Sequence, residues 1–443
     1  IVNFGRKHKV FMKLILGLGV TGLSVARFFI RNNIPFRIAD SRQEPPMLKI
    51  SKNENLLHDF SFGDWSESLL DDISEVIISP GIAESESIVR WIHEKNISII
   101  SDIELFGRYV KAPIIGITGS NGKSTVTQLL GEMALASAFK AYICGNIGNP
   151  VMESIYDDAE LYIVELSSYQ LDYTNQLDLF AAVITNISPD HLDRYDNYEA
   201  YISSKLSIYN YCKHKAINLS DSLLSEINGD CLYGFDINDS KCKFIAKTDK
   251  NIHKIYFNNE EIISSEGLAI VGVHNIENIL AALSLGDMIG LSIANMVNAT
   301  KAFKGLEHRL EFVTNINSVD YFNDSKSTNA NSTITAINAL SDRYESIILI
   351  AGGIAKNEDY STMFRLIGKK IQSIFLIGES KELFSQNIKG CSVNLVESME
   401  EAVISSKKLA KEGAVLLSPG CASFDMFSDF SERGVVFKNL VLK

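Results

Sequence analysis

The chain has 443 residues, of which 46% are hydrophobic and 22% charged, and its formal net charge is -12. This length exceeds what a single hydrophobic core supports, so two or three domains are expected. The acidic balance argues against a general binder of nucleic acids or anionic membranes, because it leaves no broad basic face. Six cysteines without a Cys-x-x-Cys pair favour free thiols in a reducing cytoplasm over a disulfide framework or a zinc site.

The N-terminal segment has the outline of a signal peptide, with lysines placed before the apolar stretch Leu14 to Ala26. The glycines inside this stretch indicate a different use. No apolar run reaches the roughly 18 to 20 residues that span a bilayer. We therefore expect a cytoplasmic protein with no membrane insertion.

The first predicted strand, Lys13 to Leu16, runs into a glycine-rich turn. Residues Gly17 to Gly22 satisfy G-x-G-x-x-G, and a helix is expected from about Leu23 to Asn32. A second strand, Phe36 to Ala39, ends at Asp40, at the spacing of a ribose-binding acid. The pattern is typical of an NAD-dependent oxidoreductase, but it also suits any nucleotide diphosphate. We favour the second interpretation because another phosphate site follows.

A third strand of this region, Glu75 to Ser79, is expected to lead into the turn Pro80-Gly81-Ile82. This turn falls at the carboxyl edge of the predicted sheet, where open parallel sheets bind ligands. A domain boundary is expected between Ser101 and Pro113, because the next strand begins the second phosphate site.

The strand Ile114 to Thr118 enters a loop, Gly119 to Thr125, that precedes the helical run Gln128 to Leu135. Loop N–H groups and the positive end of a helix can surround a polyphosphate, while Lys123 reaches its terminal phosphates and a hydroxyl binds magnesium. The fit to a standard P-loop is imperfect, because Ile117 replaces the first glycine. A tight turn that needs glycine for its dihedrals is the alternative. The order of strand, loop and helix favours a nucleoside triphosphate site.

The remaining elements alternate between strands and helices, which implies parallel sheets with covering helices. Residues 217–270 have short β-like runs and predict a small additional sheet, and a third α/β unit is expected to start near His308. The other predicted elements are strands at Leu161–Leu166, Ala181–Asn186, Ile347–Ala351, Ile374–Ile377 and Val415–Ser418, and a helix at Asn275–Ile289.

Polar side chains follow several of these strands. Glu165 ends an apolar strand and His191 follows the next one, as expected for residues that hold magnesium near a P-loop. The alternatives are a helix cap or solvated strand end for Glu165, and a packing or capping role for His191. In the third region, residues 323–329, 351–356 and 418–425 are polar loops that follow β-like runs. Three such loops favour a ligand-binding cleft over ordinary turns.

Taken together, these motifs resemble the ATP-dependent Mur ligases of peptidoglycan synthesis along essentially the whole chain. Within that family, Ser79 to Ile82, Asp102 to Phe106 and Ser418 to Asp425 are most similar to the members that add D-glutamate to UDP-N-acetylmuramoyl-L-alanine. The motifs that carry the family resemblance are Gly116–Thr125, Glu165–Gln170, Asp190–Tyr195, His274–Asn278, His308–Arg309 and Asn323–Lys326.

The resemblance implies an α/β chain of three domains. A Rossmann-like N-terminal domain, residues 1–101, would bind UDP, and a P-loop ATPase-type central domain with a small extra sheet, residues 102–306, would bind ATP. A Rossmann-like C-terminal domain, residues 307–443, would receive the amino acid. The glycine-rich turn is then expected to hold UDP in place of NAD, through Gly19, Val20, Thr21, Asp40, Ser41, Arg42 and Gly81. Asn146 is implied to meet the sugar-peptide portion.

The same resemblance implies the other sites. Lys123, His191 and Lys205 are the implied catalytic residues, with Lys205 carbamylated; from the residues alone, a solvated helix position is the simpler interpretation of Lys205. The implied ATP-binding residues are Gly119, Asn121, Gly122, Lys123, Ser124, Thr125, Asn275, Asn278, Arg309 and Asp324. Magnesium (Mg²⁺) would be held by Ser124, Glu165, His191 and Lys205. The D-glutamate pocket would be bordered by Lys326, Thr328, Lys356, Ser423 and Phe430. Ile354-Ala355 departs from the Asp-Gly of the family beside Lys356.

The resemblance thus implies amide bond formation through an acyl phosphate, with ATP and Mg²⁺ as cofactors, in a monomer. The nearest alternative is a Mur ligase with a different amino acid substrate. A folate polyglutamylating ligase, an NAD-dependent oxidoreductase and a P-loop switch protein are the others.

Overall fold

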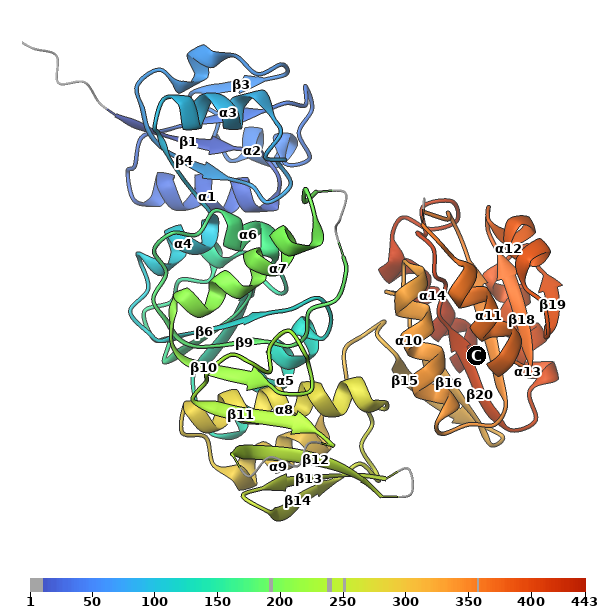
Figure 1. Ribbon diagram of the computed structural model, residues 1–443. Coiled ribbons are helices and arrows are strands. Elements are labelled where there is room, and N and C mark those ends of the chain that lie inside the picture. Colours follow the sequence, from blue (N-terminus) through green and yellow to red (C-terminus); the bar gives the residue numbers. More distant parts are fainter. Residues whose placement is uncertain (1–10, 191–193, 237–240, 250–251, 357) are drawn as a thin grey trace, which may run out of the picture. The chain divides into compact units, whose positions relative to one another are not determined.

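The computed structural model describes residues 11–190, 194–236, 241–249, 252–356 and 358–443, and these form two compact units (Figure 1). The first unit contains the described residues up to Ile245 together with Leu280–Met296, and the second contains Ala246–Ile279 and Val297–Lys443. Strand β12 (Cys242–Asp249) and the helices α8 (Val273–Met288) and α9 (Ile293–Ala302) belong partly to each unit.

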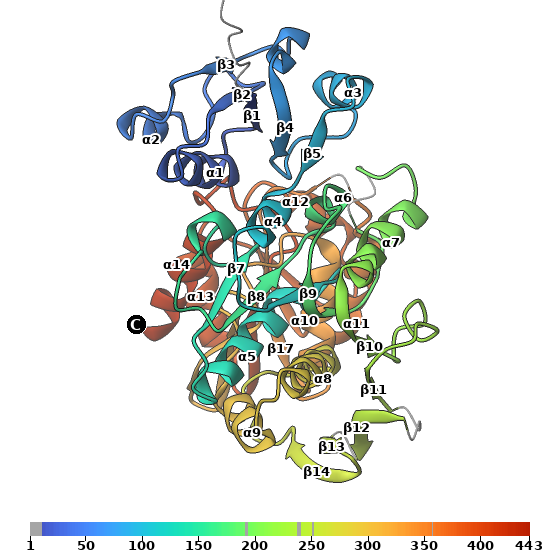
Figure 2. The same cartoon turned by 90° about the vertical axis from the view of Figure 1, so that its left-hand side faces the viewer.

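The first unit begins with a parallel sheet in the order β3-β2-β1-β4-β5. Neighbouring residues of β1 face opposite sides of this sheet: Ile15 packs in the core that includes α1, and Leu14 and Leu16 in the core that includes α3 (Figure 2). The elements are β1 (Met12–Leu16), α1 (Val20–Arg31), β2 (Phe36–Asp40), α2 (Leu48–Asn53), β3 (Phe60–Phe62), the 3₁₀ helix η1 (Glu67–Leu70), β4 (Ile73–Ile78), α3 (Ser87–Glu94) and β5 (Ser98–Ile100).

Helix α1 begins three residues earlier than the predicted start at Leu23, because only Gly17 to Gly19 form the turn. Gly17 has a φ of 96°, which glycine tolerates without strain. Gly22 already lies in the helix, where an added Cβ would overlap the carbonyl oxygen of Gly17. The third glycine of the motif therefore permits close packing of the helix on the turn.

We expect Gly22→Ala to lower the free energy of unfolding by about 1–3 kcal/mol, because the new methyl group has no space beside Gly17. Denaturant unfolding of the two proteins would measure this change. Gly19→Ala is the matched control, since an added Cβ at Gly19 meets nothing within 4 Å. Equal losses in the two variants would contradict the packing role of Gly22.

The larger sheet of the first unit is also parallel, with neighbours in the order β11-β10-β9-β6-β8-β7. Strands β10 and β11 extend this sheet, whereas the sequence predicted that the residues from 217 onward form a small separate one; their register pairs Ala216 with Cys231. The elements are α4 (Asp102–Gly107), β6 (Ile114–Thr118), α5 (Lys123–Ala136), β7 (Ala141–Gly145), η2 (Val151–Glu153), β8 (Leu161–Glu165), α6 (Ser168–Asp172), β9 (Leu179–Ile184), α7 (Tyr198–Leu206), η3 (Ser207–Asn210), β10 (Cys212–Asn218) and β11 (Cys231–Phe235).

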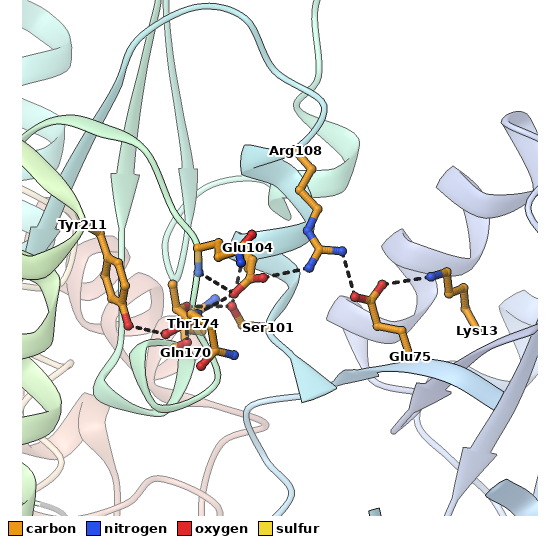
Figure 3. Close-up of polar contacts among 10 residues, drawn as sticks. Lys13, Glu75, Ser101, Glu104, Arg108, Gln170, Thr174 and Tyr211 are labelled. Carbon is orange, nitrogen blue, oxygen red and sulfur yellow. Dashed lines mark hydrogen bonds and ion pairs between the residues drawn. The ribbon is translucent and has the colours of Figure 1, made fainter. Parts of the chain in front are cut away.

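A chain of charged groups joins the two sheets of the first unit (Figure 3). Lys13 on β1 donates to Glu75 on β4 at 3.1 Å, and Glu75 accepts from Arg108 at 2.8 Å. Arg108 also donates at 2.8 Å to Glu104, which is 1% exposed and accepts from the backbone N–H groups of residues 175 and 176. Because each buried carboxylate has several donors, this network fixes the smaller sheet beside α4.

The second unit contains the antiparallel pair β13–β14 and a sheet in the order β15-β16-β20-β17-β18-β19. Strand β15 is antiparallel to β16, and the other neighbours are parallel. The elements are β13 (Ile252–Phe257), β14 (Glu260–Ser264), β15 (Glu311–Ile316), β16 (Val319–Asn323), α10 (Ala330–Ser341), β17 (Ile347–Gly352), α11 (Ser361–Lys370), β18 (Ser373–Ile377), α12 (Lys381–Asn387), β19 (Ser392–Leu395), α13 (Met399–Leu409), β20 (Gly413–Leu417) and α14 (Phe430–Leu442).

Helices cover both faces of this second sheet (Figure 1). Residues of α10, α11 and α12 form one core with Leu349 and Leu416, and residues of α13 and α14 form the other with Ile348 and Val415. Strands β16, β20 and β17 are parallel neighbours, so the loops that follow them lie at one edge of the sheet. The doubly wound architecture therefore brings the three polar loops singled out in the sequence together.

Candidate functional site

A cavity of about 510 Å³ opens at the carboxyl edge of the first sheet. Its lining includes all seven residues expected at a UDP site: Gly19, Val20, Thr21, Asp40, Ser41, Arg42 and Gly81. Sequence reasoning missed Trp65 and Glu86, which also line it and are joined by a hydrogen bond of 2.9 Å from the indole N–H. Their loops carry no motif, so only the fold places them at the cavity.

Asp40 lines this cavity and accepts several hydrogen bonds there. Its carboxylate is 2% exposed and accepts from the Leu18 N–H at 2.7 Å, from the Arg42 N–H at 2.9 Å and from the Arg42 guanidinium at 2.8 and 2.7 Å. Burial opposes ionisation, but these donors outweigh it and hold the pKa of the carboxyl below its ordinary value. Because four donors occupy the carboxylate, Asp40 fixes the glycine turn and Arg42 instead of offering a vacant acceptor.

The loop between β6 and α5 has the backbone that a phosphate cradle needs. Gly119 and Gly122 have φ values of 144° and 85°, and Gly122 precedes a helix that starts at Lys123, five residues before the predicted helical run. The Lys123 ammonium donates to the carbonyl oxygens of Gly119 at 2.8 Å and Ser120 at 3.1 Å. The N-terminus of α5 can thus present N–H groups and a positive dipole to an anion.

Lys205 on α7 is buried beside this loop and is not a solvated helix residue. It is 2% exposed, and its ammonium donates to the Gly119 carbonyl oxygen at 2.8 Å, so two lysines share one acceptor. Burial, followed by the charge of Lys123, lowers the pKa of Lys205 to about 7. As the pH rises through 7, an increasing fraction of this amine is neutral and nucleophilic.

Glu165 ends β8 with one carboxylate oxygen unpaired. The residue is 1% exposed; Oε1 accepts from the Asn146 side chain at 2.7 Å, and Oε2 is buried without a hydrogen-bond partner. The helix cap at this position is Ser167, so Glu165 is neither a cap nor a solvated strand end. A buried anionic oxygen without a donor is costly unless a cation binds it, so Glu165 fits a metal ligand.

Of the other expected metal ligands, the structure describes Ser124 but not His191. Ser124 follows Lys123 in the first turn of α5 and is 8% exposed. His191 lies outside the described residues. Within the part of the chain that the structure describes, no three His, Cys, Asp or Glu side chains converge as a metal cluster. Of the ligands expected from the sequence, Glu165 and Ser124 are therefore the described residues whose side-chain oxygens could hold a cation.

Four residues expected at ATP lie in the second unit. Asn278 donates to Asn275 at 3.2 Å on α8. Asp324 accepts from Leu310 at 3.0 Å and from two serine hydroxyls, and burial raises its pKa to about 6. The charge of Arg309 acts on both Asp324 and His274, and its Nε is buried without a partner. Arg309 therefore interacts electrostatically with both Asp324 and His274 and supplies a buried donor without a partner, as a ligand site can.

Four of the five residues expected at the amino acid lie on the three polar loops of the second unit, and the fifth, Phe430, begins α14. The Lys326 ammonium lies 5.7 Å from the centre of the Phe430 ring, and Ser423 is 2% exposed. Thr328 is half-buried and Lys356 exposed, and the Lys356 N–H donates at 3.0 Å to the Tyr360 hydroxyl. The last of the three loops also carries Phe424, which is 71% exposed.

The loop before Lys356 is held through its backbone. Ile354 and Ala422 exchange two hydrogen bonds of 3.0 Å, and an added Cβ at Gly353 would overlap the Ala422 carbonyl oxygen. The departure from the family pattern at Ile354 therefore leaves this link intact, because main-chain atoms make it.

Three family models together match most of the chain. The Mur ligase MurD-like N-terminal domain matches residues 12–101, the Mur ligase middle domain matches 117–286, and the glutamate ligase domain of Mur ligases matches 308–421. The chain is 39% identical over 435 residues to the UDP-N-acetylmuramoylalanine--D-glutamate ligase of Marinobacter nauticus, covering 97% of each chain. The chain belongs to the Mur ligase family.

Other members agree with this assignment. Ligases of the same name from Nitrosococcus oceani and Coxiella burnetii are 39% and 38% identical to this Mur ligase over 97% of its length, covering 96% and 98% of their own. In structure, it is similar to the UDP-N-acetylmuramate-alanine ligase of Thermotoga maritima, with a TM-score of 0.62 at 18% identity over 98% of this chain and 100% of that one. The structural likeness confirms the three-domain α/β fold of the family.

Two further observations concern the setting of this Mur ligase. All six cysteines are free thiols, as the sequence predicted. Over the described ranges, no helix combines the length and the apolar character needed to cross a membrane.

Proposed function

We propose that this Mur ligase joins D-glutamate to UDP-N-acetylmuramoyl-L-alanine with hydrolysis of ATP, as a step in peptidoglycan precursor synthesis. The identity of 38–39% to D-glutamate ligases along 97% of the chain carries the proposal. The cavity around Arg42, the loop at Lys123 and the polar loops around Lys326 support it, since each has the chemistry that one substrate requires.

The reaction has to turn a carboxylate, which is a poor electrophile, into an activated acyl group. In the proposed sequence the terminal carboxylate of the UDP-linked substrate attacks the γ-phosphate of ATP, which gives an acyl phosphate and ADP. The neutral amine of D-glutamate then attacks the acyl carbon and loses a proton, and inorganic phosphate leaves as the amide forms. Both steps bring anions together, so Lys123 and the α5 N-terminus have to offset negative charge.

Magnesium fits the residues present, because the unpaired Oε2 of Glu165 is an oxygen ligand without a donor. We assign Ser124, Glu165, His191 and carbamylated Lys205 to its binding. When bound, the ion offsets phosphate charge and aligns the phosphoryl group for transfer.

Lys205 is proposed to carry a carbamate. A buried ammonium with a pKa of about 7 loses its proton at neutral pH and can then add carbon dioxide, which converts a cation into an anion. The anion would remove the repulsion between Lys205 and Lys123 and would supply a further oxygen ligand.

The domain roles remain those predicted from the sequence: residues 1–101 for UDP, 102–306 for ATP and 307–443 for the amino acid. Asn146 is proposed to act on the sugar-peptide portion, besides orienting Glu165. The free thiols suit a reducing cytoplasm. A monomer stays a prediction that analytical ultracentrifugation can check.

The decisive experiment measures phosphate release from ATP with UDP-N-acetylmuramoyl-L-alanine and one candidate amino acid at a time. D-glutamate should be required, and the product should contain it in amide linkage. Turnover with L-alanine or a diamino acid would indicate a different Mur ligase, and phosphate release without any amino acid would contradict ligation.

In the UDP cavity, we expect Asp40→Asn to raise the KM for the UDP substrate about 10- to 100-fold, because the charged bonds that hold Arg42 are lost. Steady-state kinetics with varied UDP substrate would measure it. Asp59→Asn is the matched control, since Asp59 pairs with Arg37 at 3.0 Å and does not line the cavity. An unchanged KM in Asp40→Asn would contradict the assignment of this cavity.

A further inference from the structure

Arg433 on α14 is one of the largest fully buried side chains of the protein, at 1% exposed. Its Nε donates to the Ser325 hydroxyl at 3.0 Å, and one terminal nitrogen donates to the Ser325 carbonyl oxygen at 2.8 Å. The other terminal nitrogen donates to the carbonyl oxygens of Cys421 at 3.1 Å and Ala422 at 3.4 Å. A single guanidinium therefore binds the loop after β16 and the loop after β20.

The guanidinium is an isolated buried cation. Among the described residues, no carboxylate comes within ion-pair distance of it, although the charges of Asp425 and Asp324 act from farther away. Burial lowers the pKa of Arg433 to about 10, so the group stays protonated at neutral pH. A buried charge without a counterion is unfavourable for folding, and such charges are found at functional sites, where their field or their fixed geometry is needed.

The residues that Arg433 contacts are sequence neighbours of the residues expected to bind the amino acid substrate. Ser325 precedes Lys326 and donates from its hydroxyl to the Phe430 carbonyl oxygen at 2.7 Å. Ala422 precedes Ser423 and forms the two-bond bridge to Ile354 in the loop before Lys356. Arg433 is thus the common support of all three loops.

We propose that Arg433 is a positioning residue that sets the affinity for an acidic amino acid substrate. It fixes Lys326 and Ser423 through their neighbours, and its charge adds to the positive potential that two carboxylates of the substrate require. This inference rests on the proposed function, and it names a residue outside the set that the sequence motifs indicate.

The test compares Arg433→Met and Arg433→Lys with the parent enzyme. In Arg433→Met, the KM for D-glutamate should rise at least about 10-fold, while the KM values for ATP and the UDP substrate change less than about 3-fold. Arg433→Lys keeps the positive charge but loses the planar guanidinium with its several N–H donors. Its KM for D-glutamate should therefore lie between that of the parent enzyme and that of Arg433→Met. Arg365→Met, on the exposed face of α11, is the control and should match the parent.

The outcomes separate the possible roles. The proposal would be overturned if the KM values for all three substrates changed in parallel. It would also be overturned if the rate decreased only in proportion to the folded fraction measured by circular dichroism. Either result would mean a purely structural role. If Arg433→Met does not fold, Ser325→Ala carries the test. It removes the bridge between Arg433 and Phe430, and an unchanged KM for D-glutamate would then overturn the proposal. A parent enzyme that does not use D-glutamate would instead refute the proposed function.

Discussion

Replacing Lys205 with alanine is expected to reduce the ligase rate about 100- to 1,000-fold, the effect of losing one well-placed electrostatic group at a transition state. Lys205 is 2% exposed, shares the Gly119 carbonyl oxygen with Lys123 and has a pKa lowered to about 7. Its position beside the loop and its readily formed neutral amine fit the proposed carbamylation. Steady-state assays with all three substrates at saturation would measure the loss.

Chemical rescue of the Lys205→Ala ligase rate can distinguish a carbamate from an unmodified ammonium at residue 205. Bicarbonate should not restore Lys205→Ala, whereas a short carboxylic acid should restore part of the rate by replacing the missing anion. In the parent enzyme, activation by bicarbonate should increase as the pH rises through about 7, because only the neutral amine adds carbon dioxide. Lys213→Ala is the control, since Lys213 pairs with Asp178 at 3.1 Å on the surface. Equal rates for Lys205→Ala and the parent would remove Lys205 from the site.

Glu165→Gln should have the second large effect, with about a 100-fold lower rate and a higher magnesium requirement. The amide can still accept from Asn146 through one oxygen, but it removes the anionic oxygen that lacks a partner. Assays over a range of magnesium concentrations would show both changes.

A second measurement makes this prediction sharper. Because Glu165→Gln neutralises a buried, half-satisfied carboxylate, it should raise the free energy of unfolding of the ligand-free protein by about 1–3 kcal/mol while activity falls. Glu160→Gln, at the exposed residue just before β8, should change neither quantity appreciably. A loss of both stability and activity in Glu165→Gln would indicate that the carboxylate is structural.

Sequence reasoning located the strands well, because buried parallel strands are continuous apolar runs. Strand β6 matches the prediction at Ile114–Thr118, and β8 differs from it only at the last residue. Helix starts were predicted too late at α1 and α5, since glycine motifs extend into the first helical turn, where periodicity is not yet visible.

The candidate sites were only partly predictable. Glycine-rich motifs indicate backbone shape directly, so the glycine turn and Asp40 at the cavity could be named from the sequence pattern, whereas Ser41 and Arg42 were named through the family resemblance. The burial of Lys205 could not, because tertiary packing against Gly119 decides it, and α7 carries no periodicity that distinguishes a buried lysine. Trp65 and Arg433 were missed for the same reason: their partners are distant in sequence.

The shared carbonyl oxygen of Gly119 has a consequence for the order of events at this loop. Burial and, after it, the repulsion between two ammonium groups at one acceptor favour the uncharged form of Lys205 while no triphosphate is present. An incoming polyanion would attract Lys123 and add negative charge near Lys205. Both changes would raise the pKa of Lys205, which would then take up a proton. If Lys205 carries a carbamate as proposed, the loop without nucleotide is therefore the state in which its amine adds carbon dioxide most readily, and modification is expected to precede nucleotide binding.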